Sequence, residues 1–119
     1  MKSNSLTSAP SWADELPFPV TLCDCEGVIL YMNEASVKSF AKRGGAELIG
    51  QNLLDCHPGD SRKKVEALLK TGSSNVYTTE KNGVKKLVYQ SPWFSDGKYA
   101  GLVEMVMPIP ASMPHFIRS

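Results

Sequence analysis

Two turn signals divide the second half of the chain into three strands. Asn82-Gly83 and Asp96-Gly97 are dipeptides that strongly favour two-residue hairpin turns, because such turns need a positive φ at their centre. The segments that they separate, 75–81, 84–94 and 98–108, are rich in β-branched and aromatic residues. The sequence therefore predicts a three-stranded antiparallel meander.

The first half predicts a shorter hairpin followed by three short helices. Segments 20–24 and 28–33 flank a tight turn at Glu26-Gly27. Asn33 is a favoured N-cap for a helix that ends at Gly44-Gly45, and 46–50 fits one further helical turn. Apolar residues at helical spacing then predict a helix over 61–71: Val65, Leu68 and Leu69.

This order of elements predicts an α+β fold. The early and late strands are expected to join in one five-stranded antiparallel sheet, with the short helices covering one face. On the last strand, Leu102, Glu104 and Val106 share a face that is too apolar to be fully exposed. We expect that face to form the back of the sheet, covered by the N-terminal turn with Trp12 and Leu16 or by a second subunit.

The length of 119 residues suits a single domain. The N-terminal residues are polar and the C-terminal segment is rich in proline. We therefore expect a flexible tail over 1–11, one domain over 12–110 and an extended tail over 111–119.

Charge and hydropathy exclude several classes of partner. The formal net charge is +1, which offers no basic footprint for direct binding of nucleic acid. No apolar run approaches the roughly 20 residues of a membrane span, and the N-terminus lacks the apolar stretch of a signal peptide. The expected location is the cytoplasm, with the three cysteines reduced.

The stretch Asp-Cys-His-Pro-Gly-Asp-Ser, residues 55–61, carries the residue types of a reaction centre. A cysteine nucleophile needs its base across a hydrogen bond, and adjacent residues in an extended turn point apart. We therefore expect no catalytic residues, and we interpret Asp60 or Ser61 as an N-cap. A second hypothesis is that His57 and Ser61 hold the anionic head of a ligand at the helix N-terminus, while a pocket holds its apolar body.

The cysteines and aromatic residues allow further hypotheses. Cys23 and Cys25 share a face if both lie on one strand. With Cys56 and His57 they make four candidate metal ligands. Because Cys-x-Cys on a strand is poor geometry for chelation, no metal site is predicted. Cys56 remains a candidate redox thiol. Four aromatic residues either pack in the core or line a cavity: Tyr31, Phe40, Tyr89 and Trp93. They would line a cavity if the face of Tyr89 and Trp93 meets the helices.

The stretch from Leu16 to Asp60 resembles the N-terminal half of a PAS domain. It has a hairpin, Asn33 at the start of the first helix, and Leu48-Ile49-Gly50 before the next helical turn, and the segment 96–109 is similar to the final PAS strand. The Cys-His-Pro loop with a downstream serine resembles a bacterial subgroup. The resemblance spans about residues 15 to 110.

The resemblance implies a sensory module rather than an enzyme. PAS domains enclose a cavity for haem, flavin or a small metabolite, or for nothing, and they signal to a partner domain. Leu53 stands where a light-sensing flavin domain has its cysteine, which disfavours flavin, and only His57 offers a route to haem. The cofactor is left open. The alternatives are a ligand-free homodimerisation scaffold and a haem- or thiol-based redox sensor, and the expected partner is a second copy or a signalling protein.

Overall fold

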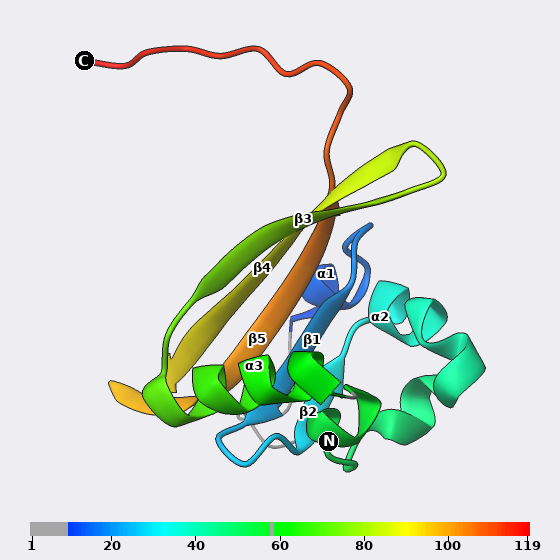
Figure 1. The fold of residues 1–119 in the computed structure, drawn as a ribbon, viewed down its shortest axis with the longest axis vertical. Coiled ribbons are helices and arrows are strands. Elements are labelled where there is room, and N and C mark those ends of the chain that lie inside the picture. The colour runs from blue at the N-terminus through cyan, green and yellow to red at the C-terminus, as the bar shows by residue number, and fades with distance from the viewer. Residues whose placement is uncertain (1–9, 58) are drawn as a thin grey trace.

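A computed structural model describes residues 10–57 and 59–119, and its centre is a curved antiparallel sheet of five strands (Figure 1). The strands lie in the order β2-β1-β5-β4-β3. The predicted α+β architecture is confirmed, because the early and late strand groups join through β1 and β5. The strand bounds are β1 Val20–Asp24, β2 Ile29–Met32, β3 Asn75–Lys81, β4 Val84–Ser95 and β5 Lys98–Pro108.

The two turn signals act as the sequence predicts. Asn82 and Asp96 have φ values of 54° and 52°, and the glycine after each has φ 78°. Positive φ at both central positions is the geometry of the hairpin turn whose twist matches that of the flanking strands. The meander β3-β4-β5 is therefore continuous, and β4 pairs with β5 over most of its length.

A β-bulge between Trp93 and Phe94 sets the register of the β4–β5 pair. Beside the turn, Phe94 pairs with Tyr99; beyond the bulge, Trp93 pairs with Gly101. Such a bulge inserts one extra residue into a strand, and a shift of one residue changes which cross-strand neighbours meet. The bulge consequently brings Gln90 opposite Glu104.

Apart from α1, which precedes β1, the helical elements lie between β2 and β3 in the chain, and α3 packs across one face of the sheet (Figure 1). One detail of the sequence prediction is wrong. Helix α3 begins at Gly59, so Asp60 and Ser61 lie in its first turn instead of capping it. The bounds are α1 Ser11–Asp14, α2 Glu34–Ser39, η1 Ala41–Arg43, η2 Gly45–Leu48, η3 Leu53–Cys56 and α3 Gly59–Thr71, where η marks a 3₁₀ helix.

The core fills the space between the helices and the inner face of the sheet. The apolar side of α3 meets Cys23 of β1 and Leu102 of β5. Each large apolar side chain buried there contributes about 1.5–3 kcal/mol. The face with Leu102, expected to be the back of the sheet, is thus the inner face. The residues of α3 in this core are Val65, Leu68 and Leu69.

The N-terminal helix α1 is tied to the outer face of the sheet. The Tyr31 hydroxyl of β2 donates a hydrogen bond of 2.5 Å to Asp14 Oδ1. Trp12, which the sequence suggests as a cover, remains 67% exposed, and Leu16 is half-buried. Helix α1 is therefore held to this face by the hydrogen bond of Asp14, and the Trp12 side chain does not cover it.

Both ends of the chain continue beyond the sheet. Residues 1–9, which make up most of the predicted N-terminal tail, lie outside the described part of the structure. Residues 109–119 contain neither helix nor strand and extend away from the sheet (Figure 1). Among the described residues, no helix is long and apolar enough to cross a membrane.

Asn33 joins three separate segments through its side chain, which is 0% exposed. Its Oδ1 accepts from the backbone N–H groups of Ser36 and Val20, each at 2.9 Å. Its Nδ2 donates to the carbonyl oxygens of Ala13 at 3.1 Å and Phe18 at 2.9 Å. The predicted N-cap is confirmed, and the same amide also fixes β1 and the segment from α1.

Asn33→Ala is expected to lower the free energy of unfolding by about 3–5 kcal/mol, because it leaves several buried backbone groups without a partner. Asn52→Ala is the matched control. Asn52 also caps a helical turn and bonds to Glu26 O, but it lies in partial contact with solvent, so about 1 kcal/mol is expected. Urea unfolding measures both values, and equal losses would contradict the role given to Asn33.

Candidate ligand-binding cleft

A polar cleft lies between the N-terminal half of α3 and the β3–β4 part of the sheet. Its volume is about 440 Å³, within the range of small-molecule sites. Only one of its lining residues, Val65, is aliphatic, so the apolar interior that the sequence suggested is not found here. The lining residues are His57, Asp60, Ser61, Lys64, Val65, Asn75, Tyr77 and Gln90.

The sheet side of the cleft is built from a row of hydrogen-bonded side chains. Asn75 of β3 donates from Nδ2 to Gln90 Oε1 at 2.9 Å, and Gln90 of β4 donates from Nε2 to Glu104 Oε2 on β5 at 2.8 Å. Asn75 lies directly opposite Gln90 on the neighbouring strand, and Gln90 lies directly opposite Glu104. Gln90 is only 4% exposed, so its amide depends on these partners.

Polar residues continue this row across the inner face. Thr21 of β1 is the cross-strand neighbour of Glu104, and its hydroxyl lies 2.6 Å from that of Ser36 on α2. Thr21 and Ser36 are both buried. We call these five residues the polar band: Asn75, Gln90, Glu104, Thr21 and Ser36. It runs from the cleft to α2.

The helix side of the cleft carries the groups expected to meet a ligand. Nδ1 of His57 donates to the Leu53 carbonyl oxygen at 2.9 Å, because a carbonyl can only accept. In the neutral ring this leaves Nε2 as an acceptor. Ser61 and Lys64 lie one helical turn apart from each other on α3, and Asp60 adds a carboxylate.

Tyr77 on β3 adds a hydroxyl donor. Burial, and secondly the negative charge of Glu104, raise the pKa of its phenol above the ordinary value. The hydroxyl therefore keeps its proton at neutral pH. Together the cleft presents donors and acceptors on both walls, with one ammonium and one carboxylate.

The structure brings together two of the predicted site residues. His57 and Ser61 line the cleft. Tyr31, Tyr89 and Trp93 do not, because the face that meets the helices carries Gln90 and Val88, and these aromatic residues lie on the opposite face. The condition under which Tyr89 and Trp93 would line a cavity is therefore not met.

Trp93 and Phe40 have packing positions instead. The Trp93 indole donates from Nε1 to Cys23 O at 2.9 Å, beside Gly101, where a Cβ would lie 2.0 Å from that same oxygen. Phe40 ends α2 and packs against the core. Neither residue lines the cleft.

The structure separates the candidate cysteine ligands. Burial raises the pKa of the Cys23 thiol to about 11, whereas Cys25 lies beyond the end of β1 and is exposed. The condition for the two thiols to share a face, that both lie on one strand, is therefore not met. The side chain of Cys56 lies outside the described part, and among the described residues no group of three or more potential ligands could hold a metal ion.

Sequence reasoning missed the sheet side of the cleft. Asn75, Tyr77, Gln90 and Glu104 were not proposed as site residues. The available signal was Gln90, an amide between Val88 and Pro92 on one face of a strand. A lone amide among apolar positions of a buried face costs free energy unless it has partners, which marks it for function.

Comparison with known proteins identifies the family. The family model described as PAS fold matches residues 13–109. The chain therefore belongs to the PAS fold family. No curated protein matches the chain significantly.

Solved structures of PAS domains share the fold at low sequence identity. The PAS domain of BvgS from Bordetella pertussis is 17% identical with a TM-score of 0.60, over 82% of this chain and 80% of that one. A sensory box sensor histidine kinase from Vibrio cholerae is 19% identical with a TM-score of 0.59, over 84% and 88%. The Aer2 receptor of Vibrio cholerae, described as a dual PAS-heme oxygen sensor, is 18% identical with a TM-score of 0.56, over 78% and 95%. These likenesses show the fold that the chain shares with them.

The Tyr31–Asp14 pair generates a prediction about alkaline stability. Burial, and secondly the hydrogen bond to Asp14, raise the pKa of the Tyr31 phenol above its ordinary value of 10.0. The folded state thus holds this proton more tightly than the unfolded chain. The resulting stabilisation is complete below about pH 10 and is lost as the pH rises toward the raised pKa.

Melting curves from about pH 8 to 11.5 test this contribution. Tyr31→Phe is expected to be less stable than the wild type near neutrality, by about 1 kcal/mol for the lost hydrogen bond. Because the phenylalanine cannot ionise, the difference should shrink as the pH rises above 10. Parallel pH profiles of the two proteins would contradict the linkage.

Proposed function

We propose that this chain is a non-catalytic PAS sensory module that binds a small polar ligand in the cleft and relays a change of shape to a partner protein. The burial of Gln90 carries the proposal. An apolar side chain at that position would pack against α3 without any need for partners. The chain instead buries an amide, and two neighbouring polar residues, Asn75 and Glu104, satisfy it with hydrogen bonds.

The chemistry of the lining defines the ligand class. With Nδ2 of Asn75 engaged, its Oδ1 is available to accept a hydrogen bond from a ligand. On the opposite wall, Ser61 and Lys64 can donate to an acceptor or an anionic group, as can the backbone N–H groups of the first turn of α3. The ligand that fits is a small molecule with a donor at one end and an acceptor or anionic group at the other.

This lining argues against haem as the ligand. A haem macrocycle is large and apolar, whereas the side chains around His57 are almost all polar. His57 is also held by its Nδ1 bond to Leu53 O. We assign His57 to ligand contact through its other nitrogen, and we propose no catalytic step.

The polar band supplies a route for the signal. A ligand that bonds to Asn75 competes with, or strengthens, the bond from Asn75 to Gln90, and so acts on Glu104 of β5. Strand β5 leads directly into the segment 109–119. A change in β5 can therefore reach a partner bound to that segment or to the outer face of the sheet.

A homodimerisation scaffold is the second candidate, and the outer face of the sheet supports it. Val76 and Tyr89 are cross-strand neighbours there, and both are exposed. Met105 and Met107 of β5 lie on the same face, half-buried. An apolar strip of this kind suits a second copy of the chain, with or without a ligand in the cleft.

Native mass spectrometry of the purified protein tests both functions at once. We expect a dimer that retains, or acquires from a panel of amino acids, carboxylates and nucleobases, one small molecule per chain. His57→Ala and Ser61→Ala together should reduce ligand occupancy by about tenfold, for loss of two polar contacts. The dimer should persist in this variant.

Ser91→Ala is the matched control, because Ser91 lies on the opposite face of β4 and bonds only to Pro92 O in the described structure. It should retain full occupancy. Equal occupancy in all three proteins would exclude the cleft as the site. A dimer without any bound or bindable small molecule would favour the scaffold over the sensor.

A further inference from the structure

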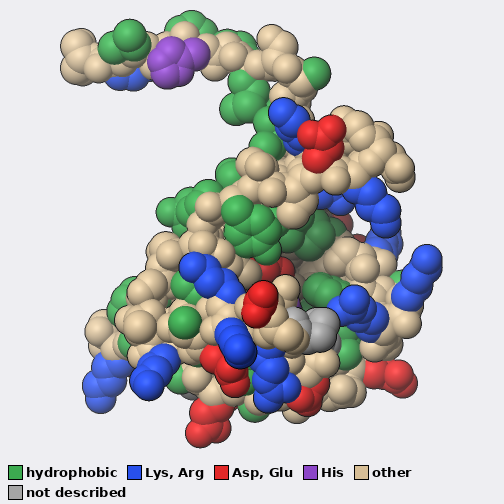
Figure 2. Space-filling view, in the orientation of Figure 1, with side chains coloured by type: hydrophobic (Ala, Val, Ile, Leu, Met, Phe, Trp, Pro, Cys, Tyr) green, Lys and Arg blue, Asp and Glu red, His purple; other side chains and the backbone are tan. Residues whose placement is uncertain are grey.

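A second hollow, separate from the cleft, lies where the helical segment after α2 approaches the β3–β4 hairpin. It has a volume of about 600 Å³. Figure 2 shows Lys and Arg side chains gathered on this side of the molecule, between the β3–β4 turn and α2. We call it the basic hollow; its lining residues are Lys38, Ser39, Phe40, Ala41, Lys42, Arg43 and Lys81.

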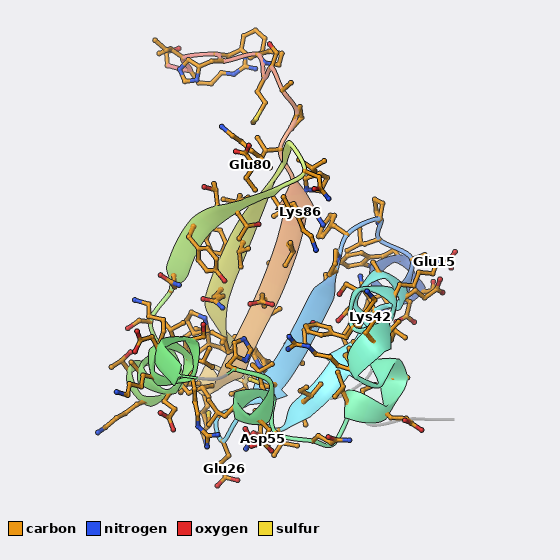
Figure 3. All side chains as sticks on the ribbon, turned by 45° about the vertical axis from the view of Figure 1, so that its right-hand side comes forward. Glu15, Glu26, Lys42, Asp55, Glu80 and Lys86 are labelled. Carbon is orange, nitrogen blue, oxygen red and sulfur yellow. The ribbon has the colours of Figure 1, made fainter. Side chains whose placement is uncertain are left out.

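Four of these seven residues carry a positive charge, and no carboxylate is among them. Lys81 also lines a neighbouring hollow of about 430 Å³ whose second cation is Lys86. Figure 3 labels one cation from each side, Lys42 on the helical segment and Lys86 on the hairpin. Five of the 13 basic residues of a chain with net charge +1 are thus concentrated in one region.

These lysines are not explained by ion pairs within the described chain. On and beside α3, Arg62 forms ion pairs with Asp55 and Glu66. Lys38, Lys42 and Lys81 take part in neither. On β3, Lys81 shares the inner face with Asn75 and Tyr77, while Glu80 lies on the outer face.

The helix dipole and the edge strand can explain why each cation stands at its own position. They do not explain why the cations surround one hollow. A cation in the last turn of α2 or η1 favours the helix dipole, and a lysine protects an edge strand such as β3 from pairing. Neither reason requires residues 38–43 and residue 81 to surround one hollow. An anion bound in the hollow would be attracted by several positive charges at once.

We propose that the basic hollow binds a small molecule with two or more negative charges, of the phosphate-ester class. Lysines hold phosphate groups as point charges, and several of them match an anion of several charges. Ser39 contributes little as a donor, because its hydroxyl already donates to Ser36 O at 3.0 Å. Charge therefore carries the recognition, and the half-buried Phe40 ring offers an apolar surface for the rest of the ligand.

This site is independent of the proposed function of the cleft, which shares none of its residues. It has a consequence for the fold. An anion held between Lys42 and Lys81 would tie the hairpin to the helical segment and so stabilise the folded state in proportion to its binding.

Inorganic tripolyphosphate is the probe, and its effect on the melting temperature is measured at constant ionic strength, set with sodium chloride. We expect a saturable rise in melting temperature for the wild type. Lys42→Gln and Lys81→Gln together should weaken the apparent affinity by about tenfold or more, since both point charges are lost. Isothermal titration calorimetry measures the same affinities directly.

Lys63→Gln and Lys70→Gln together form the control, because both residues are exposed on α3, away from the hollow, and the loss of net charge is identical. This variant should bind tripolyphosphate as the wild type does. Equal weakening in both double variants, or a rise no larger than that produced by chloride alone, would overturn the proposal. So would binding of a short polyglutamate peptide but not of tripolyphosphate, which would instead indicate an acidic protein partner.

Discussion

The buried amide of Asn33 is the interaction on which the arrangement of this domain depends. It satisfies two backbone donors and two backbone acceptors from the α1 region, the segment leading into β1 and the first turn of α2. Only an amide side chain offers both a double acceptor and a double donor at one buried point. Because β1 is the strand that connects the early hairpin to the meander, fixing its start relative to α2 also fixes the helices over the inner face of the sheet. The space between α3 and the sheet follows from this placement.

The cleft and the polar band extend the same principle to function. The inner face carries a row of polar side chains, in which Asn75, Gln90 and Glu104 are joined by hydrogen bonds, as are Thr21 and Ser36. None of the described buried side-chain polar atoms lacks a partner. A row of this kind has two properties that an apolar core lacks. It presents specific hydrogen-bonding groups at its open end, beside His57 and Ser61, and a change at that end alters the partners of the groups behind it. We infer that this row is one connected unit from Asn75 to Glu104.

The sequence was sufficient for the three-stranded meander, because the Asn-Gly and Asp-Gly turns leave little choice of pairing among its strands. It also predicted that the early strands join the same sheet, but not that β1 pairs with β5. It also placed His57 and Ser61 beside the start of a helix, and both residues line the cleft. It was not sufficient for the sheet wall of the cleft. Alternation along β5 shows which residues share a face, but both faces are similarly apolar, with Leu102 and Val106 on one and Val103 and Met105 on the other, so nothing local decides which face meets the helices. The contact between Gln90 and Glu104 also depends on the bulge at Trp93, since the turn alone would place Val103 opposite Gln90.

Hydrogen exchange of side-chain amides, followed by NMR on ¹⁵N-labelled protein, tests the connected row most directly. If the row is connected, the side-chain amide protons of Gln90 and Asn75 exchange more slowly than those of Asn82, which is exposed at a turn. In Glu104→Ala, exchange should become faster at Asn75 as well as at Gln90, although Asn75 does not touch the substituted residue. Fast exchange at Gln90 in the wild type, or an effect of Glu104→Ala that stops at Gln90, would contradict the account.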